Sequence, residues 1–92
     1  MKIIVEGKKA GKATRVTYDL FDTYDAVNGV HSMARTTGYT ATAAVRLVAK
    51  GLWEQRGVFA PEMLGFKQAC VDFLLAELRQ RGVIYKETIE FP

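Results

Sequence analysis

The spacing of apolar residues changes its period along this chain, and the order of these periods restricts the fold more than any other sequence feature. Residues 2–6 are centred on the apolar, β-branched run Ile3-Ile4-Val5, and residues 13–22 alternate between apolar and polar side chains, so both are predicted strands. Residues 32–50 and 66–81 repeat apolar positions with the period of a helix, and residues 83–91 alternate again. The order β-β-α-α-β predicts an α+β fold, in which two main helices pack on one face of a small, mostly antiparallel sheet.

Glycine-containing segments separate the predicted elements. Two glycines in residues 7–11 predict a turn of about five residues that joins the first two strands into a hairpin. The Asn28-Gly29 pair within residues 23–30 predicts a loop before the first helix. Residues 53–60 form a predicted connection between the helices.

Local signals also mark the ends of the helices. Ser32 is a predicted N-cap, and Lys50 followed by Gly51 is typical of a helix C-terminus. Pro61 suits the first turn of a further short helical segment, which Gly65 is expected to break.

One face of the first helix carries the small residues Ala34, Gly38 and Ala41. A glycine inside a helix costs about 1 kcal/mol relative to alanine. A helix lined by small residues lets another backbone approach closely, so we expect this face to lie against another element.

Composition limits the class of protein. The 92 residues are 49% apolar and 25% charged, which is typical of a globular protein, and we expect one domain over residues 1–92. No apolar run approaches the ~20 residues of a membrane span, and Met1 is followed by no signal peptide, so we expect no membrane partner. The single Cys70 can form no internal disulfide, which favours a reducing, cytoplasmic location.

The net charge of +3 is modest, but the basic residues are unevenly placed. Five of them crowd the first fifteen residues: Lys2, Lys8, Lys9, Lys12 and Arg15. A basic hairpin tip could contact phosphates, but charged residues also protect an exposed sheet edge, and we expect no nucleic-acid partner.

Motifs of known enzyme classes are absent. The sequence contains no G-x-G-x-x-G, no Walker loop, no H-E-x-x-H and no C-x-x-C. Cys70 and His31 are too few to build a zinc site, so we expect no metal, and Cys70 is expected to be a buried structural thiol. His31 precedes a helix, where it either makes local hydrogen bonds or faces a site. We assign no catalytic residue.

The start of the first helix is the most informative stretch. Free backbone N–H groups and the helix dipole favour an anion there. Arg35 could clamp a carboxylate of the substrate, and hydroxyl groups could donate further hydrogen bonds, which makes a candidate anion or substrate site of Ser32, Arg35, Thr36 and Thr37. In the structural alternative, Ser32 caps the helix, Thr37 is only a small packing residue, and Arg35 forms an ion pair within the protein.

Five sequence blocks resemble one protein family. SMARTTGYTATAA (32–44) is followed by RLVAKG, by GVFAPEMLG (57–65) and by LRQRGVIY at the end of the second helix. With the preceding KATRVTYDLFDTYD, these blocks are similar to the C-terminal end of the saccharopine dehydrogenase family over about residues 5–85. That family includes saccharopine reductases, lysine 6-dehydrogenases and carboxynorspermidine dehydrogenases.

The resemblance implies an oxidoreductase with an N-terminal NAD(P)-binding domain and a second domain for an amino-acid or polyamine substrate. This chain would be its excised or free-standing C-terminal domain, inactive alone, completing the substrate domain and bracing it against the nucleotide-binding domain. NAD or NADP would belong to the parent enzyme, with no cofactor in this chain. The competing hypothesis is an independent module that binds a protein or acidic partner through its basic hairpin.

The apolar rows of the second helix also predict self-association. Val71, Leu75 and Leu78 form one row beside a second row around Phe73, and a three-stranded sheet buries one such face more easily than both. We expect a homodimer, joined through the helical layer or the last strand.

Overall fold

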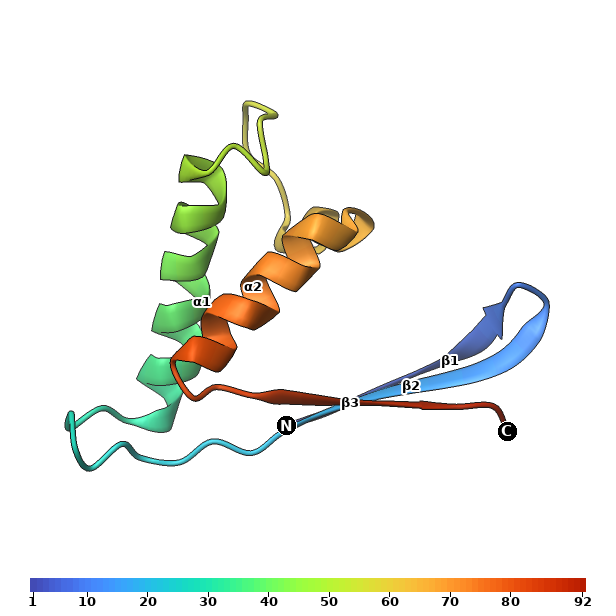
Figure 1. The fold of residues 1–92 in the computed structure, drawn as a ribbon, viewed down its shortest axis with the longest axis horizontal. Coiled ribbons are helices and arrows are strands. Elements are labelled where there is room, and N and C mark those ends of the chain that lie inside the picture. The colour runs from blue at the N-terminus through green and yellow to red at the C-terminus, as the bar shows by residue number, and fades with distance from the viewer.

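The computed structural model describes all 92 residues. In chain order it contains β1 (Lys2–Lys9), β2 (Lys12–Leu20), α1 (Ser32–Ala49), the short 3-10 helix η1 (Pro61–Phe66), α2 (Gln68–Gln80) and β3 (Tyr85–Glu90) (Figure 1). The three strands form one antiparallel sheet with β2 in the centre. This arrangement confirms the predicted α+β fold class.

The hairpin of β1 and β2 ends in a tight turn. The prediction of a turn over residues 7–11 is wrong, because pairing continues to Lys9 and Lys12 and leaves only Ala10 and Gly11 between the strands. Both turn residues have positive φ, 52° and 77°, which is the geometry that matches the twist of a two-residue hairpin.

The helix ends differ from the predicted ones by one or two residues. His31 occupies the N-cap position, so the assignment of Ser32 as the cap is wrong by one residue. At the other end the prediction is confirmed: Lys50 is the C-cap, and Gly51 follows with φ 74°.

The second half of the chain follows the predicted order with shorter elements. The helical turn predicted from Pro61 forms η1, which extends through Gly65 to Phe66. Helix α2 therefore begins at Gln68 and not at residue 66. Strand β3 begins at Tyr85, because Val83 still donates its backbone N–H to the carbonyl of Leu78 at the end of α2.

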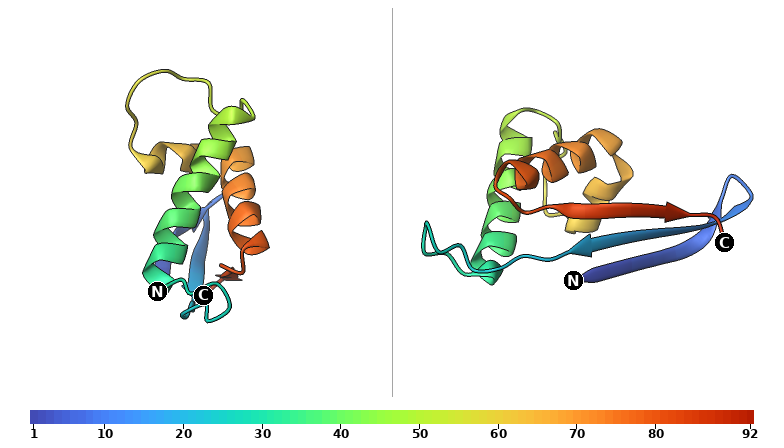
Figure 2. Two further views of the ribbon diagram at one scale, coloured as in Figure 1. Left: turned by 90° about the vertical axis from the view of Figure 1, so that its left-hand side faces the viewer. Right: turned by 60° about the horizontal axis from the view of Figure 1, so that its bottom comes forward.

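The two helices cover only one end of the sheet. One core cluster joins sheet and helices through Leu20, Leu78 and Val83, with Tyr39 and Tyr85 packed against it. A second cluster lies within the helical layer and is built on Leu47, Trp53 and Cys70. Every residue of β1 is exposed, and the hairpin extends beyond the helices (Figure 2). The helices thus pack mainly on each other and leave most of the sheet uncovered.

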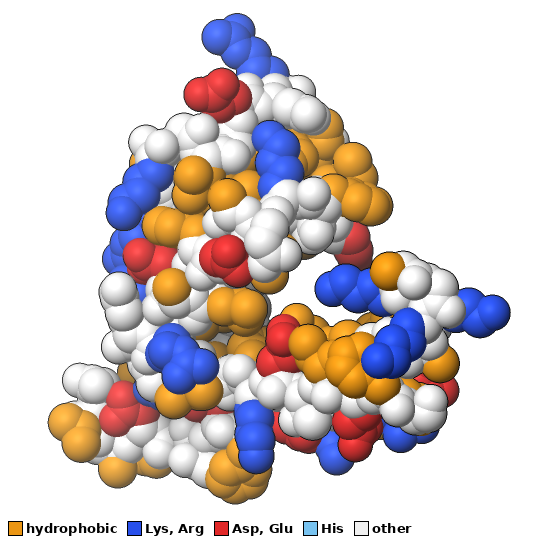
Figure 3. Space-filling model, turned by 45° about the vertical axis from the view of Figure 1, so that its right-hand side comes forward, with side chains coloured by type: hydrophobic (Ala, Val, Ile, Leu, Met, Phe, Trp, Pro, Cys, Tyr) orange, Lys and Arg blue, Asp and Glu red, His pale blue; other side chains and the backbone are white.

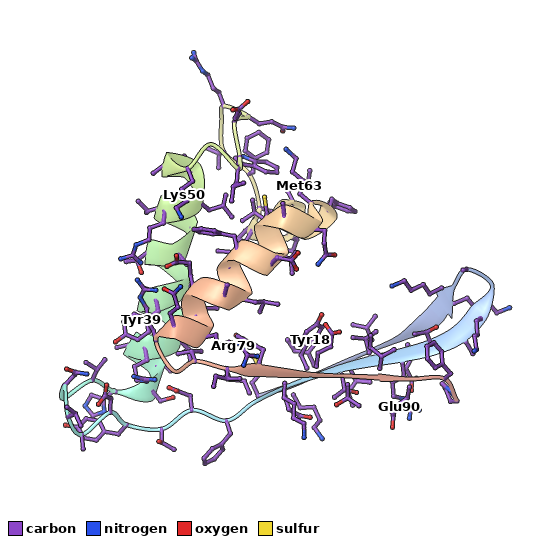
Figure 4. The ribbon with its side chains drawn as sticks, viewed as in Figure 1. Tyr18, Tyr39, Lys50, Met63, Arg79 and Glu90 are labelled. Carbon is purple, nitrogen blue, oxygen red and sulfur yellow. The ribbon has the colours of Figure 1, made fainter.

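The sheet has two chemically different faces. Strand register and alternation place one set of side chains on the side of the helices. This face, called here the apolar face, carries Ile3, Val5, Val16, Tyr18, Leu20, Tyr85 and Ile89, together with Thr14, Glu87 and the two lysines beside the turn, Lys9 and Lys12. The opposite, charged face carries ion pairs between Lys2 and Asp19 (3.5 Å) and from Arg15 to Glu6 (2.6 Å) and Glu90 (3.5 Å). In Figure 4, Tyr18 and Glu90 accordingly project from opposite sides of the sheet.

The expected packing of the small-residue face of α1 is wrong. Ala34, Gly38 and Ala41 are exposed, and a Cβ added at Gly38 would meet no atom within 4 Å. Helix α2 contacts another face of α1, through Leu47 and its neighbours. Neither helix is long and apolar enough to cross a bilayer.

Candidate functional site

The loop from β2 to α1 and the first turn of α1 form one hydrogen-bonded unit around Arg35. Asp22 and Asp25 lie on the loop, and both carboxylates point at the guanidinium group of Arg35. The Arg35 side chain is only 10% exposed, and those of Asp22 and Asp25 are 7% and 17% exposed. The loop is closed by paired backbone hydrogen bonds between Asp25 and Val30.

The guanidinium donates in three directions. Nε of Arg35 lies 3.2 Å from Oδ2 of Asp22, and Nη1 lies 3.1 Å from Oδ2 of Asp25. Nη2 donates to Oδ1 of Asp22 at 3.3 Å and to the backbone carbonyl of Arg81 at 3.1 Å. Arginine suits this role because its planar group carries five donors in a fixed arrangement.

These contacts shift the pKa values of Asp25 and Arg35. The hydrogen bond from the Asn28 side chain is the largest influence that lowers the pKa of Asp25, and backbone N–H groups of Asn28 and Val27 and the charge of Arg35 act in the same direction. The hydrogen bond to Asp22 raises the pKa of Arg35. Both shifts favour the charged forms of Asp25 and Arg35.

The charge balance around Arg35 matters for any anion that would bind there. Two carboxylates face one guanidinium, so the cluster of Arg35, Asp22 and Asp25 carries a net charge of −1. The structure thus shows Arg35 in an ion pair within the protein, as the structural alternative for this site predicted. The sequence analysis did not identify either aspartate as a partner of Arg35, although the available signal was a pair of carboxylates in the loop ahead of a helix that carries an arginine in its first turn.

The other residues of the predicted site are separated from the guanidinium. Ser32 and Thr36 line a hollow of about 440 Å³ together with Asp22, Met1 and Met33. Ser32 Oγ donates to the carbonyl of Asp22 at 3.1 Å, and Thr36 Oγ1 donates to the carbonyl of Ser32 at 3.1 Å. Thr37 is exposed and lies outside this hollow. The structure therefore brings Ser32 and Thr36 together but directs Arg35 elsewhere.

Comparison with known families gives one match. Residues 1–83 match the family described as "Saccharopine dehydrogenase C-terminal domain". The chain belongs to this family. The match covers the hairpin, both helices and all of the Arg35 cluster, while β3 lies just beyond it. No solved structure matches the chain.

A second hollow of this saccharopine dehydrogenase C-terminal domain lies between α2 and the sheet. It has a volume of about 600 Å³ and is bounded by Leu75 and Arg79 of α2 and by Tyr18, Tyr85 and Glu87 of the sheet. Figure 4 shows Arg79 and Tyr18 on the same side of the sheet. Tyr18 donates a hydrogen bond from its hydroxyl group to Glu87, and this bond is the main cause that raises the pKa of Tyr18.

His31 of this family member lies at the start of α1, whereas Cys70 belongs to α2 and packs near the other end of α1. His31 precedes the helix and packs against Tyr24, with the two ring planes tilted by 47° and the ring centroids 5.1 Å apart. Cys70 is buried, as predicted, against Leu47 and Trp53 near the other end. The two residues therefore form no catalytic pair, and no group of three or more metal-ligating side chains gathers in the chain.

Proposed function

We propose that this chain serves as the C-terminal domain of an NAD(P)-dependent oxidoreductase acting on a C–N bond of an amino acid or polyamine, and that it is inactive alone. Membership of the saccharopine dehydrogenase C-terminal domain family is the observation that carries this proposal. In the parent enzyme the domain would complete the substrate domain and brace it against the nucleotide-binding domain. Its uncovered sheet supports a role in contact with other protein surfaces.

The residues of this chain do not fit a dinucleotide. Dinucleotide-binding folds hold the pyrophosphate at a glycine-rich turn before a helix. The loop before α1 lacks that turn, and the hollow at the start of α1 is bordered by the Asp22 carboxylate, which would repel phosphate. We therefore assign NAD or NADP to another part of the parent enzyme and derive no step of the reaction from this chain.

The test is a titration of the isolated chain with NADH and with NADPH, followed by calorimetry and by nicotinamide fluorescence. We expect no binding at millimolar concentrations of either nucleotide. A dissociation constant in the micromolar range would contradict the proposal. A matched assay for oxidation of lysine or saccharopine by the chain alone should also give no turnover.

The basic hairpin favours a second candidate function, an independent module that binds an acidic protein. Lys8, Lys9 and Lys12 surround the turn and form no ion pair within the chain, and the Lys12 ammonium lies 4.4 Å from the ring centroid of Phe91. A polyglutamate peptide is the direct probe. Salt-sensitive binding that is lost when all three lysines are replaced by serine would support this module.

The DNA sequence upstream of the Met1 codon separates the two functions. An open reading frame that continues into a strand followed by G-x-G-x-x-G supports the oxidoreductase. A stop codon and a promoter at that position support the independent module. The substrate or anion site of Ser32, Arg35, Thr36 and Thr37 stays a prediction for the parent enzyme.

A further inference from the structure

Asn28 is the sole asparagine of the chain, and Gly29 follows it directly. Asparagine is one of the chemically labile residues of proteins. An asparagine before glycine is especially prone to lose its side-chain amide, because the backbone nitrogen of a residue without a Cβ reaches the asparagine side chain most easily. The turn between Asp25 and Val30 uses the backbone of this pair, with φ 66° at Gly29, and leaves the reactivity of the side chain unassigned.

The loop that carries Asn28 is open to water. It forms an outer corner of the molecule below the start of α1 (Figure 1; Figure 3). Asn28 and Gly29 are both exposed, and the neighbouring Val27 side chain is 93% exposed. A segment with so few buried apolar contacts opens locally at little cost in free energy. The folded chain therefore gives this pair both access to water and freedom to move.

The two groups that would react are not engaged in hydrogen bonds. The backbone N–H of Gly29 donates to no acceptor, because the paired backbone bonds of the loop join Asp25 and Val30 on either side of it. The side-chain carbonyl oxygen of Asn28 accepts no hydrogen bond. Only the amide nitrogen is held, since Nδ2 of Asn28 donates to Oδ2 of Asp25 at 2.9 Å. The nucleophile and the carbonyl carbon are therefore both available.

We propose that Asn28 is a site of spontaneous deamidation, which releases the loop from Arg35. The backbone nitrogen of Gly29 bonds to the side-chain carbonyl carbon of Asn28, the bond from that carbon to Nδ2 breaks, and ammonia leaves with the proton that Gly29 gives up. Water then opens the resulting succinimide ring. Opening at the side-chain carbon gives aspartate at position 28, and opening at the backbone carbon gives isoaspartate. In total, one water is consumed and one ammonia is released, without oxidation or reduction.

Either product removes a donor from Asp25 and adds a negative charge beside it. The cluster of Arg35, Asp22 and Asp25 already carries a net charge of −1, so a new carboxylate repels Asp25. Isoaspartate also adds a methylene group to the main chain inside the loop. Both changes weaken the contact of 3.1 Å between Asp25 and Nη1 of Arg35. This inference is independent of the proposed oxidoreductase function, so the two can fail separately.

Incubation of the folded chain at mildly alkaline pH, followed by mass spectrometry and by labelling with an isoaspartate methyltransferase, tests the chemistry. The sequence contains no other asparagine and no Asp-Gly pair, so the label reports position 28. We expect conversion within about tenfold of the rate of a free peptide of residues 24–31. Gly29→Ala should slow conversion about tenfold, and circular dichroism shows whether this variant keeps the fold. Asn28→Gln, which keeps an amide, should not convert on the same timescale.

Two variants test the effect of the product on the fold. Asn28→Asp reproduces the aspartate product, and Asn28→Ala is the matched control, because it removes the same hydrogen bond without adding a charge. At low salt, Asn28→Asp should melt a few degrees below Asn28→Ala. High salt should narrow this difference, because it screens the repulsion from Asp25. A chain whose mass is unchanged when the free peptide has converted, or equal melting temperatures of the two variants at low salt, would overturn the inference.

Discussion

The guanidinium of Arg35 contacts the Asp22 carboxylate through Nε, at 3.3 and 3.2 Å from its two oxygens, and donates from Nη2 to the carbonyl of Arg81. Asp22 precedes Arg35 by 13 residues and Arg81 follows it by 46. One side chain thus fixes three elements: the loop after β2, the first turn of α1 and the end of α2. The relative position of the two helices depends on this contact as well as on the apolar clusters.

Replacing Arg35 by lysine should lower the melting temperature of the chain. A single ammonium cannot reach both aspartates and the Arg81 carbonyl, so at least one buried acceptor loses its partner. Thermal unfolding followed by circular dichroism measures the effect. Arg79→Lys is the control, because Arg79 is exposed and forms no ion pair. Equal melting temperatures for both variants would contradict the structural role of Arg35.

The same substitution, made in the full-length parent enzyme, tests the predicted substrate role. If Arg35 also binds the carboxylate of the substrate, Arg35→Lys should raise the KM for the amino acid more than the KM for NAD(P). Steady-state kinetics with each substrate varied in turn gives both constants. Unchanged KM values together with lower thermal stability would leave Arg35 a purely structural residue.

Replacing Asn28 by alanine should raise the pKa of Asp25 toward its ordinary value of 3.8. The Asn28 side chain donates to Oδ2 of Asp25 at 2.9 Å and is the largest influence on that pKa. Because the folded-state pKa is lowered, this contribution to stability is complete above the unfolded value and is lost as the pH falls through the folded one. NMR titration of the carboxyl carbon measures the shift, and the variant should unfold at a higher pH on acidification.

A control variant distinguishes the effect of the Asn28 side chain on the pKa of Asp25 from the effect of the loop conformation. Val27→Ala keeps the backbone N–H that donates to Asp25 at 3.0 Å, and the Val27 side chain is exposed. The pKa of Asp25 should not change in this variant. A similar rise in both variants would mean that loop geometry, and not the Asn28 amide, sets the pKa.

Gly38→Ala should stabilise the chain by about 1 kcal/mol, the difference in helix propensity between the two residues. A methyl group at this position meets nothing within 4 Å. Gly82→Ala should instead lower the stability of the chain. Gly82 has φ 78°, a conformation that strains other residues, and its added Cβ would lie 3.4 Å from Nη2 of Arg35. Urea unfolding of both variants gives the two free energies. A loss of stability in Gly38→Ala would show that another surface covers this face of α1.

Leu47→Ala should cost about 2–5 kcal/mol, because it removes a buried side chain and leaves a cavity. Leu47 is 1% exposed and packs with Trp53 and Cys70 in the cluster that holds the helices together. Val45→Ala on the same helix is the control, with Val45 69% exposed, and should change stability by less than about 0.5 kcal/mol. Urea unfolding followed by Trp53 fluorescence reports both.

Features that depend on neighbouring residues could be predicted from the sequence. The end of α1 at Lys50 and Gly51 follows from the left-handed conformation that glycine adopts without strain, and Pro61 starts η1 because its fixed φ suits a first turn. Alternation in residues 13–22 and 83–91 identified the ends of the central strand and of β3 to within two residues. The blocks around Arg35 and Pro61 were sufficient to indicate the family.

Features that depend on contacts between distant segments could not be predicted. The hairpin turn shortened to Ala10 and Gly11 because backbone pairing of Gly7 with Thr14, Lys8 with Ala13 and Lys9 with Lys12 extends the ladder, and local turn signals do not measure that gain. The partners of Arg35 include a carbonyl 46 residues away.

The sequence by itself determined the order and type of the elements, because backbone conformation responds to residues within about one turn of helix or one strand pair. The tertiary structure decided which surfaces those elements cover. Gly38 is exposed and Leu47 is buried because α2 packs against only one side of α1. Val5 is exposed because the helices cover only the end of the sheet at Leu20. Burial depends on the positions of all elements at once, and periodicity gives only the direction in which an apolar side chain points.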